Sequence, residues 1–199
     1  TMSLIGRRTD LHIYAPRDFS SMLNFFLGHF GDGIKFRIEH HPLTFHDKEL
    51  ICGTKTADIY AFPLNHGIET YGFLFREKWQ DHPLAPKRKE RSIAYCSDTA
   101  PFDNLAGWVS GADILYHETT YTEDMRAVAN ARYHSTAAQA AKVAAEAGVG
   151  KLIAGHFSSR YKDLNVMLEE ARPVFPETFL AEEGLKFEIP YCRLDEESD

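Results

Sequence analysis

Ser92-Ile93-Ala94-Tyr95-Cys96-Ser97 is a short apolar run that ends directly before an acidic residue, Asp98. Its length and composition are typical of a buried β-strand. Three further runs have the same design, each ending before a histidine: 58–65 before His66, 112–116 before His117, and 151–155 before His156. Because neighbouring buried strands bring their ends to one edge of a sheet, we expect these imidazoles and the carboxylate to converge. The sequence therefore predicts a metal site built from segments that lie far apart in the chain.

The composition is that of a folded protein. With 199 residues, 44% of them apolar and 26% charged, the chain has enough material for one sizeable core. A net charge of −7 disfavours binding of nucleic acid by the whole surface, although a local basic patch could still bind it. Three cysteines without a CxxC pair are typical of reduced thiols in the cytoplasm, and no apolar run approaches the roughly 20 residues of a membrane span. We therefore expect a cytoplasmic domain over residues 1–190 without a membrane segment, followed by an acidic tail over 191–199.

Hydrophobic periodicity indicates an α/β protein. A strand over 11–14, closed by Pro16, precedes an amphipathic helix over 19–30 that Gly31 stops, and over 34–38 the apolar period becomes two. Residues 77–91 form a basic, proline-containing loop. Beyond this loop we expect three helices: 122–131, a helix from the T-x-x-Q capping box at Thr136 to Gly148, and one from Asp163 to Pro173. Strands that alternate with helices predict helices packed on a sheet.

The strand-end residues each have a structural alternative. Asp98 could be a turn or helix-cap residue, and His66 could be a structural residue between two strands. His117 and Glu118 are costly to bury unpaired at the end of an apolar strand, which favours a functional pair. A strand-end histidine that bonds only to the backbone is the alternative for His117.

Two further segments carry groups that suit a phosphate. His134 directly precedes the capped helix, whose N-terminus attracts anions, and an imidazole there can donate a proton or a hydrogen bond. The alternative is a helix cap without a functional histidine. Arg160 suits a bidentate phosphate contact, with the hydroxyls of Ser135 and Tyr161 as further candidates, and a surface ion pair is the alternative for Arg160.

Five segments resemble one known family in their sequences and in their order along the chain. The segments are Leu64-Asn65-His66-Gly67-Ile68-Glu69-Thr70-Tyr71-Gly72-Phe73, Ser97-Asp98-Thr99, His117-Glu118-Thr119-Thr120, His134-Ser135-Thr136, and His156-Phe157-Ser158-Ser159-Arg160-Tyr161. They resemble ribonuclease Z, the tRNA 3′-processing endonucleases of the metallo-β-lactamase superfamily. The resemblance implies an α/β fold of the αββα sandwich type, a pair of zinc ions (Zn2+) per site, and a homodimer. It also implies hydrolysis of precursor tRNA on the 3′ side of the discriminator nucleotide.

The resemblance also assigns a role to individual residues. His66 looks like a terminal ligand of one zinc ion, Asp98 like the carboxylate that bridges both ions, and His156 like a ligand of the other. His117, Glu118 and His134 stand at positions that the family associates with catalysis, supporting the site and handling the phosphate or the leaving group. Two neighbouring zinc ions activate the attacking water and stabilise charge on the attacked phosphate.

The sequence departs from the family in three respects. The HxHxDH signature, which supplies further ligands for both metals, does not occur, and Thr1 to Gly6 looks like the segment shortly after it. We therefore expect a fold that is incomplete at its N-terminus and a 199-residue piece that is inactive by itself on precursor tRNA. Residues 77–91 stand where the family has a long arm that grips tRNA, so they are either a basic loop or a shortened arm. Arg132 stands where many relatives have Asp.

These departures leave two alternative functions open. The short 77–91 interval allows another phosphodiesterase of the metallo-β-lactamase fold, with a different substrate. The missing signature allows a non-catalytic domain that binds RNA or protein and keeps a vestigial site.

Overall fold

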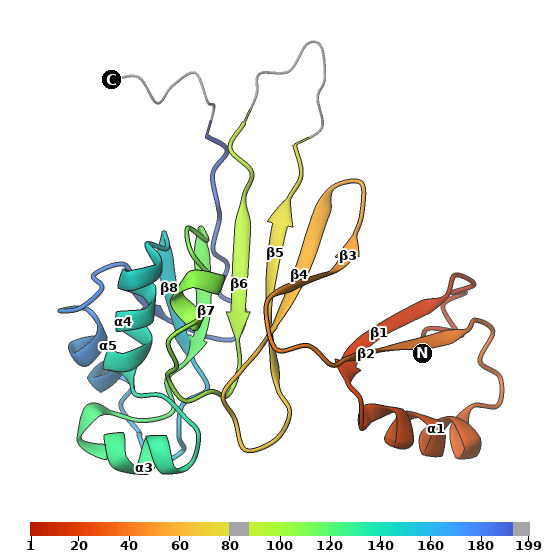
Figure 1. Cartoon of the computed structure of the whole chain (residues 1–199), viewed down its shortest axis with the longest axis horizontal. Helices are drawn as coiled ribbons and strands as arrows, with labels where there is room; N and C mark the ends of the chain where they lie inside the picture. The colour runs from red at the N-terminus through yellow and green to blue at the C-terminus, as the bar shows by residue number, and fades with distance from the viewer. Residues whose placement is uncertain (80–87, 193–199) are drawn as a thin grey trace. The chain divides into compact units, whose positions relative to one another are not determined.

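The computed structural model describes residues 1–79 and 88–192 (Figure 1). The chain forms two compact units, Thr1–His46 and Asp47–Asp199. Parts of the predicted basic loop (80–87) and of the predicted acidic tail (193–199) lie outside the described residues. The single domain predicted over 1–190 stays a prediction, and each unit is described by itself below.

The first unit is a small parallel ribbon with a helical crossover. Strand β1 (Leu11–Pro16) pairs in parallel with β2 (Ile38–Leu43), and α1 (Phe19–Phe30) connects them. The predicted strand and helix are confirmed, including the helix end at Gly31. The period-two run over 34–38 is not a strand up to Ile38, because the amide of Ile34 donates to the carbonyl of Gly31 and continues the turn. No residue of α1 is buried.

The second unit is built on one mixed sheet of seven strands, in the order β3-β4-β5-β6-β7-β8-β9. The strands are β3 (Glu49–Gly53), β4 (Ala57–Pro63), β5 (Tyr71–Glu77), β6 (Ser92–Cys96), β7 (Ile114–Glu118), β8 (Lys151–Gly155) and β9 (Thr178–Leu180). Pairing is antiparallel from β3 to β6 and parallel from β6 to β9. The parallel half contains three of the four apolar runs that the sequence singles out, so the predicted α/β layering is confirmed.

Helices cover one face of this sheet. They are α2 (Leu105–Trp108), the 3₁₀ turn η1 (Glu123–Met125), α3 (Arg126–Ala131), α4 (Ala137–Ala147) and α5 (Asn165–Ala171). Helix α4 lies against β7 and β8, with α5 beside it (Figure 1). Its buried alanines let it approach Leu74, Leu115 and Leu152 of the sheet closely. Each of these fully buried leucines contributes roughly 1.5–3 kcal/mol. The other face exposes Phe75 and Tyr95.

The helix ends follow the predicted signals in part. The capping box of α4 is confirmed, since Thr136 Oγ1 accepts from the amide of Gln139 and the Gln139 side chain accepts from the amide of Thr136. Gly148 ends α4 with a φ of 59°. The helix predicted over 122–131 is divided between η1 and α3. The prediction that Asp163 caps α5 is wrong, because Leu164 is the first flanking residue and Asp163 forms a turn with Asn165 instead.

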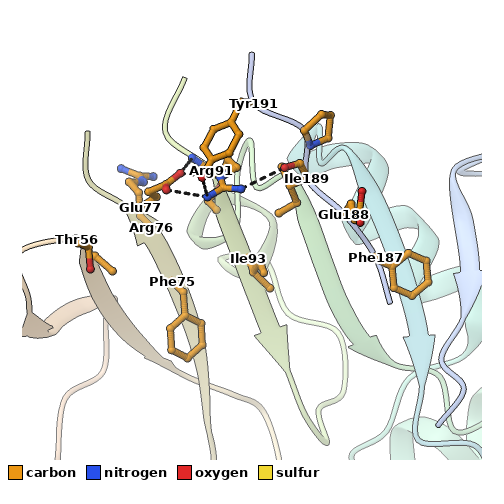
Figure 2. A pocket seen from close by; sticks show the side chains of 13 residues that line it. Thr56, Phe75, Arg76, Glu77, Arg91, Ile93, Phe187, Glu188, Ile189 and Tyr191 are labelled. Carbon is orange, nitrogen blue, oxygen red and sulfur yellow. Dashed lines mark hydrogen bonds and ion pairs between the residues drawn. The ribbon is translucent and has the colours of Figure 1, made fainter. Parts of the chain in front are cut away.

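A pocket of about 720 Å³ opens at the edge of the sheet where β6 begins (Figure 2). There the guanidinium of Arg91, at the end of the predicted basic loop, donates to both carboxylate oxygens of Glu77 at 2.7 and 2.8 Å. This hydrogen bonding lowers the pKa of Glu77. Arg91 also donates to the carbonyl of Ile189. The pocket lies at the opposite end of β6 from Asp98, so it is separate from the predicted metal site.

No helix within residues 1–79 or 88–192 combines the length and the apolar character needed to cross a membrane.

Candidate metal centre

The sheet topology brings the predicted strand-end residues to one edge. Strands β6, β7 and β8 are parallel neighbours in which Cys96 pairs with His117, and His117 with Ala154. Asp98 and His156, which follow β6 and β8, therefore emerge on the same side. Because β5 runs antiparallel to β6, the β4–β5 loop that carries His66 reaches this edge as well. Residues separated by about ninety positions of chain thus meet.

His66 is held in one orientation by the backbone. Its Nδ1 lies 3.0 Å from the carbonyl oxygen of Tyr133. A carbonyl can only accept a hydrogen bond, so Nδ1 carries the proton and Nε2 of the neutral ring carries the lone pair. That Nε2 lies 4.0 Å from Oδ2 of Asp98. His66 therefore presents a metal-ligating nitrogen to the carboxylate.

His156 is held in the same tautomer by a hydroxyl group. Oγ1 of Thr120 lies 2.6 Å from Oε2 of Glu118 and 2.9 Å from Nδ1 of His156. The hydroxyl has one proton, which it donates to the carboxylate, so it accepts from the Nδ1–H of His156. The Nε2 lone pair of His156 then faces Oδ1 of Asp98 at 3.4 Å.

Two histidines therefore face different oxygens of a single carboxylate. Fixing the Nδ1–H of a histidine through a carbonyl or hydroxyl is the usual way in which proteins orient a metal-ligating Nε2. Imidazole nitrogen together with carboxylate oxygen suits Zn²⁺ and neighbouring divalent transition ions. The donor atoms of His66, Asp98 and His156 therefore fit a divalent metal ion, both in their chemistry and in the orientation of the two imidazoles.

His134 completes the cluster without being one of the predicted ligands. Its ring stacks on His156 with centroids 5.5 Å apart and meets the edge of His66 at 5.3 Å. Ligand-type atoms of Asp98, His134 and His156 all lie within 4.8 Å of one another. Nδ1 of His134 lies 2.9 Å from Oε1 of Glu118.

Glu118 is fully buried beneath these histidines. Its carboxylate accepts hydrogen bonds from the backbone amides of Thr99, Thr120 and Ser135, all between 3.0 and 3.1 Å. These bonds offset the cost of burying a charge, so Glu118 is paired, as expected for a carboxylate at the end of an apolar strand. Glu118 is therefore a fixed anchor that orients His134.

The backbone is unusual beside the centre. Tyr133 and His156 are the non-glycine residues with a positive φ, 58° each, within the part of the chain that the structure describes. Such a conformation is uncommon and costs of order 1–3 kcal/mol. One of these residues is a candidate ligand and the other directly precedes His134. Gly155 is required next to His156, since a Cβ there would lie 2.3 Å from the Tyr116 hydroxyl.

Some predicted site residues lie inside the protein and not at the centre. His117 is fully buried; its Nδ1 lies 2.7 Å from the carbonyl of Glu118, and burial lowers its pKa. His117 thus has the arrangement named above as its structural alternative, a strand-end histidine hydrogen-bonded to the backbone. Ser135 is also fully buried, and its hydroxyl donates to the carbonyl of Thr99.

The two remaining candidates differ in accessibility. The Tyr161 hydroxyl accepts a hydrogen bond from the amide of Thr122 at 3.0 Å and is hydrogen-bonded to the Thr122 hydroxyl at 2.7 Å. Arg160 is exposed, its Nε donates to Ser158, and its guanidinium lies 5.0 Å from the ring centre of Tyr121. Of the predicted phosphate contacts, only Arg160 has a charged group open to solvent.

Two residues at the centre are not among those predicted from the sequence. Thr120 connects Glu118, His134 and His156, and Tyr133 holds His66 through its carbonyl. Thr120 stands inside a segment that the family resemblance singles out, which could have indicated it. A backbone carbonyl leaves no signal in a sequence, so Tyr133 could not have been found.

The second unit is a mixed sheet with helices on one face. Histidines surround a carboxylate at the carboxyl edge of its parallel strands. These features are those of the β-lactamase superfamily. The family described as the β-lactamase superfamily domain matches residues 1–157. The chain is 33% identical to the ribonuclease Z of Cytophaga hutchinsonii over 95% of this chain and 72% of that protein. It is 35% identical to the ribonuclease Z of Azobacteroides pseudotrichonymphae over 92% of this chain and 71% of that protein. The chain belongs to the ribonuclease Z family of this superfamily.

Solved structures agree on the fold. The short form of human tRNase Z has a TM-score of 0.73 at 22% identity, covering 94% of this chain and 70% of that one. The metallo-β-lactamase fold protein YhfI from Bacillus subtilis has a TM-score of 0.69 at 18% identity, covering 94% of this chain and 68% of that one. The family and the α/β metallo-β-lactamase fold predicted from the sequence are thereby confirmed.

Proposed function

We propose that this protein is a zinc-dependent endoribonuclease that cleaves precursor tRNA on the 3′ side of the discriminator nucleotide. Membership of the ribonuclease Z family supports the reaction, because the relatives named above carry that name. The observation that carries the proposal is the pair of histidines, His66 and His156, whose Nε2 atoms face the two different oxygens of Asp98.

His66, Asp98 and His156 are the proposed metal ligands. The two oxygens of Asp98 face different imidazoles, so this carboxylate could be shared by a pair of Zn²⁺ ions, with His66 and His156 as further ligands. Zinc bound there would lower the pKa of the attacking water and stabilise charge on the attacked phosphate. Three protein ligands are enough for one ion, whereas a bridged pair needs more ligands than these.

His134 is the proposed proton donor, with Glu118 as its partner. A carboxylate that accepts from Nδ1 keeps the ring oriented, as in other histidine–carboxylate pairs. A proton on Nε2 can then pass to the 3′ oxygen as its bond to phosphorus breaks. His117 and Ser135 are buried and bonded to backbone carbonyls, so we propose structural roles for them, where the sequence suggested catalysis for His117 and a phosphate contact for Ser135.

Two exposed residues are the proposed substrate contacts. Arg160 has a solvent-exposed guanidinium on the segment after His156, and guanidinium groups bind phosphate well. Tyr133 is 46% exposed beside the centre, and it lines a pocket of about 240 Å³ together with Asn65 and Pro101. Aromatic rings stack on unpaired nucleotide bases, so Tyr133 suits the base next to the cleaved bond.

The test is cleavage of a precursor tRNA with a 3′ extension. We would compare the 199-residue chain with a version that carries an HxHxDH segment upstream, each supplied with Zn²⁺, and map the cut by sequencing the product. Cleavage after the discriminator nucleotide by either form supports the proposal. Hydrolysis of bis-(p-nitrophenyl) phosphate without cleavage of tRNA would favour another phosphodiesterase. Absence of bound zinc and of both activities would favour a binding domain. Light scattering of the same samples measures whether the protein is the homodimer that we expect.

A further inference from the structure

A second group of metal-ligating side chains lies in the first unit, on the β1–β2 ribbon. The register pairs His12 with Glu39 and Tyr14 with His41. Because alternate residues of a strand point to the same face, these four side chains share one face of the ribbon. None of them belongs to the candidate metal centre, whose residues are all in the second unit.

Three of these side chains converge on one point. Nδ1 of His12 lies 2.9 Å from Nε2 of His41 and 3.3 Å from Oε2 of Glu39. Ligand-type atoms of the three residues all lie within 4.8 Å of one another. The ligand atoms of a tetrahedral zinc ion, with bonds of about 2.0–2.2 Å, lie about 3.3 Å apart. The two separations from Nδ1 of His12 are within a few tenths of an ångström of that value.

The outer contacts of the cluster fix two of the three side chains. The ring of His41 stacks on that of Tyr14, with centroids 4.6 Å apart and planes 15° from parallel. The other oxygen of Glu39, Oε1, is paired with the guanidinium of Arg37, which leaves Oε2 directed at His12. Contacts of this kind hold the two side chains in the orientation that a ligand needs.

We propose that His12, Glu39 and His41 form a binding site for one divalent transition ion of the zinc class. The ligand atoms are Nδ1 of His12, Oε2 of Glu39 and Nε2 of His41. His12 is half-exposed, so water can supply a fourth ligand. The bound ion joins β1 to β2, and it stabilises the ribbon because it binds only where the two strands are paired.

The experiment is a Zn²⁺ titration of the whole chain against a chromophoric chelator at neutral pH. Three variants accompany the wild type: H12Q/H41Q, D98N/H156Q, which disables the candidate metal centre, and H46Q, which removes one exposed imidazole of the same unit as a control. We expect H12Q/H41Q to lose one equivalent of zinc, and H46Q to lose none. D98N/H156Q is expected to keep the equivalent that H12Q/H41Q loses.

Two outcomes overturn the site. One is a zinc stoichiometry in H12Q/H41Q equal to that of the wild type. The other is a D98N/H156Q variant that is folded by circular dichroism and binds no zinc. If H12Q/H41Q does not fold, E39Q decides the matter, since removing the carboxylate is expected to weaken this equivalent at least about tenfold, and an unchanged affinity contradicts the proposal. A D98N/H156Q variant that loses an equivalent of zinc but keeps the one that H12Q/H41Q loses concerns only the proposed hydrolase site.

Discussion

The buried carboxylate of Glu118 lies 2.9 Å from Nδ1 of His134, a histidine whose ring reaches the surface between His66 and His156. The same carboxylate accepts from backbone amides of two other segments, those of Thr99 and Ser135. Glu118 therefore connects the stability of the fold to the orientation of the proposed proton donor, and the two functions can be separated by substitution.

Replacing Glu118 and replacing His134 should have different effects. Glu118→Gln puts an amide NH₂ among backbone donors, so the free energy of unfolding should fall by about 1–3 kcal/mol. His134→Gln should change the unfolding free energy by less than about 1 kcal/mol, yet slow tRNA cleavage by roughly 10²–10⁴-fold. Urea denaturation and single-turnover cleavage measure the two quantities, in whichever form of the protein cleaves tRNA. A His134→Gln variant that cleaves at the wild-type rate would remove its proposed role.

Asp98→Ala should abolish cleavage while leaving the fold intact. The side chain is 31% exposed, and its ion pairs within residues 1–79 and 88–192 are with His66 and His156, so little packing is lost. Asp103→Ala is the matched control, because Asp103 is an exposed aspartate in the loop that follows. Cleavage rates and melting temperatures of the two variants are compared. Full activity in Asp98→Ala would exclude Asp98 as a ligand.

Thr120 offers a test of how His156 is oriented. Thr120→Val keeps the shape of the side chain but removes the hydroxyl that accepts from Nδ1 of His156, so zinc affinity at the centre should fall about 10–100-fold. Thr120→Ser restores the hydroxyl and should restore most of the affinity. The titration is performed in the H12Q/H41Q background. Equal affinities for the valine and serine variants would show that the hydroxyl does not matter.

His117 should make stability depend on pH. Its pKa is lowered in the folded chain by burial, and Nε2 has no hydrogen-bond partner within the part of the chain that the structure describes. The unfolded chain, in which the pKa is about 6.5, therefore binds the proton more readily. Stability is full above about pH 6.5 and falls as the pH drops towards the folded pKa, by at most about 1.4 kcal/mol per pH unit for this one group.

Urea denaturation of the wild type and His117→Leu from about pH 7.5 to 5 checks this dependence. The leucine variant is expected to lose less stability over that interval, whatever its stability at neutral pH. Identical slopes for the two proteins would mean that His117 does not carry the titration.

The convergence of the strand-end residues was predictable because it depends on local sequence and on one property of parallel sheets. Apolar runs ending at Asp98 and His156 become β6 and β8, and their neighbours in the sheet bring the polar ends together. The capping box at Thr136 is equally local, which is why the start of α4 was predictable.

Tertiary contacts decided what the sequence could not predict. His117 and Glu118 are adjacent in β7, yet only the side chain of Glu118 is hydrogen-bonded to His134. Successive side chains of a strand point to opposite faces of the sheet. The hydroxyl of Ser135 is taken by a carbonyl that lies far away in the chain, at Thr99. Arg91 looks like part of a solvated basic loop, but Glu77 on the neighbouring strand pairs with it.

The proposed metal centre is tested most directly by long-range ¹H–¹⁵N NMR of the histidine rings while Zn²⁺ is added to the H12Q/H41Q chain. We predict that the Nε2 signals of His66 and His156 shift together on zinc binding, while their Nδ1 atoms remain protonated, bonded to Tyr133 and Thr120. Nε2 signals of His66 and His156 that stay unchanged at saturating zinc, or a shift at Nδ1 instead, would contradict a metal centre held by these two histidines and Asp98.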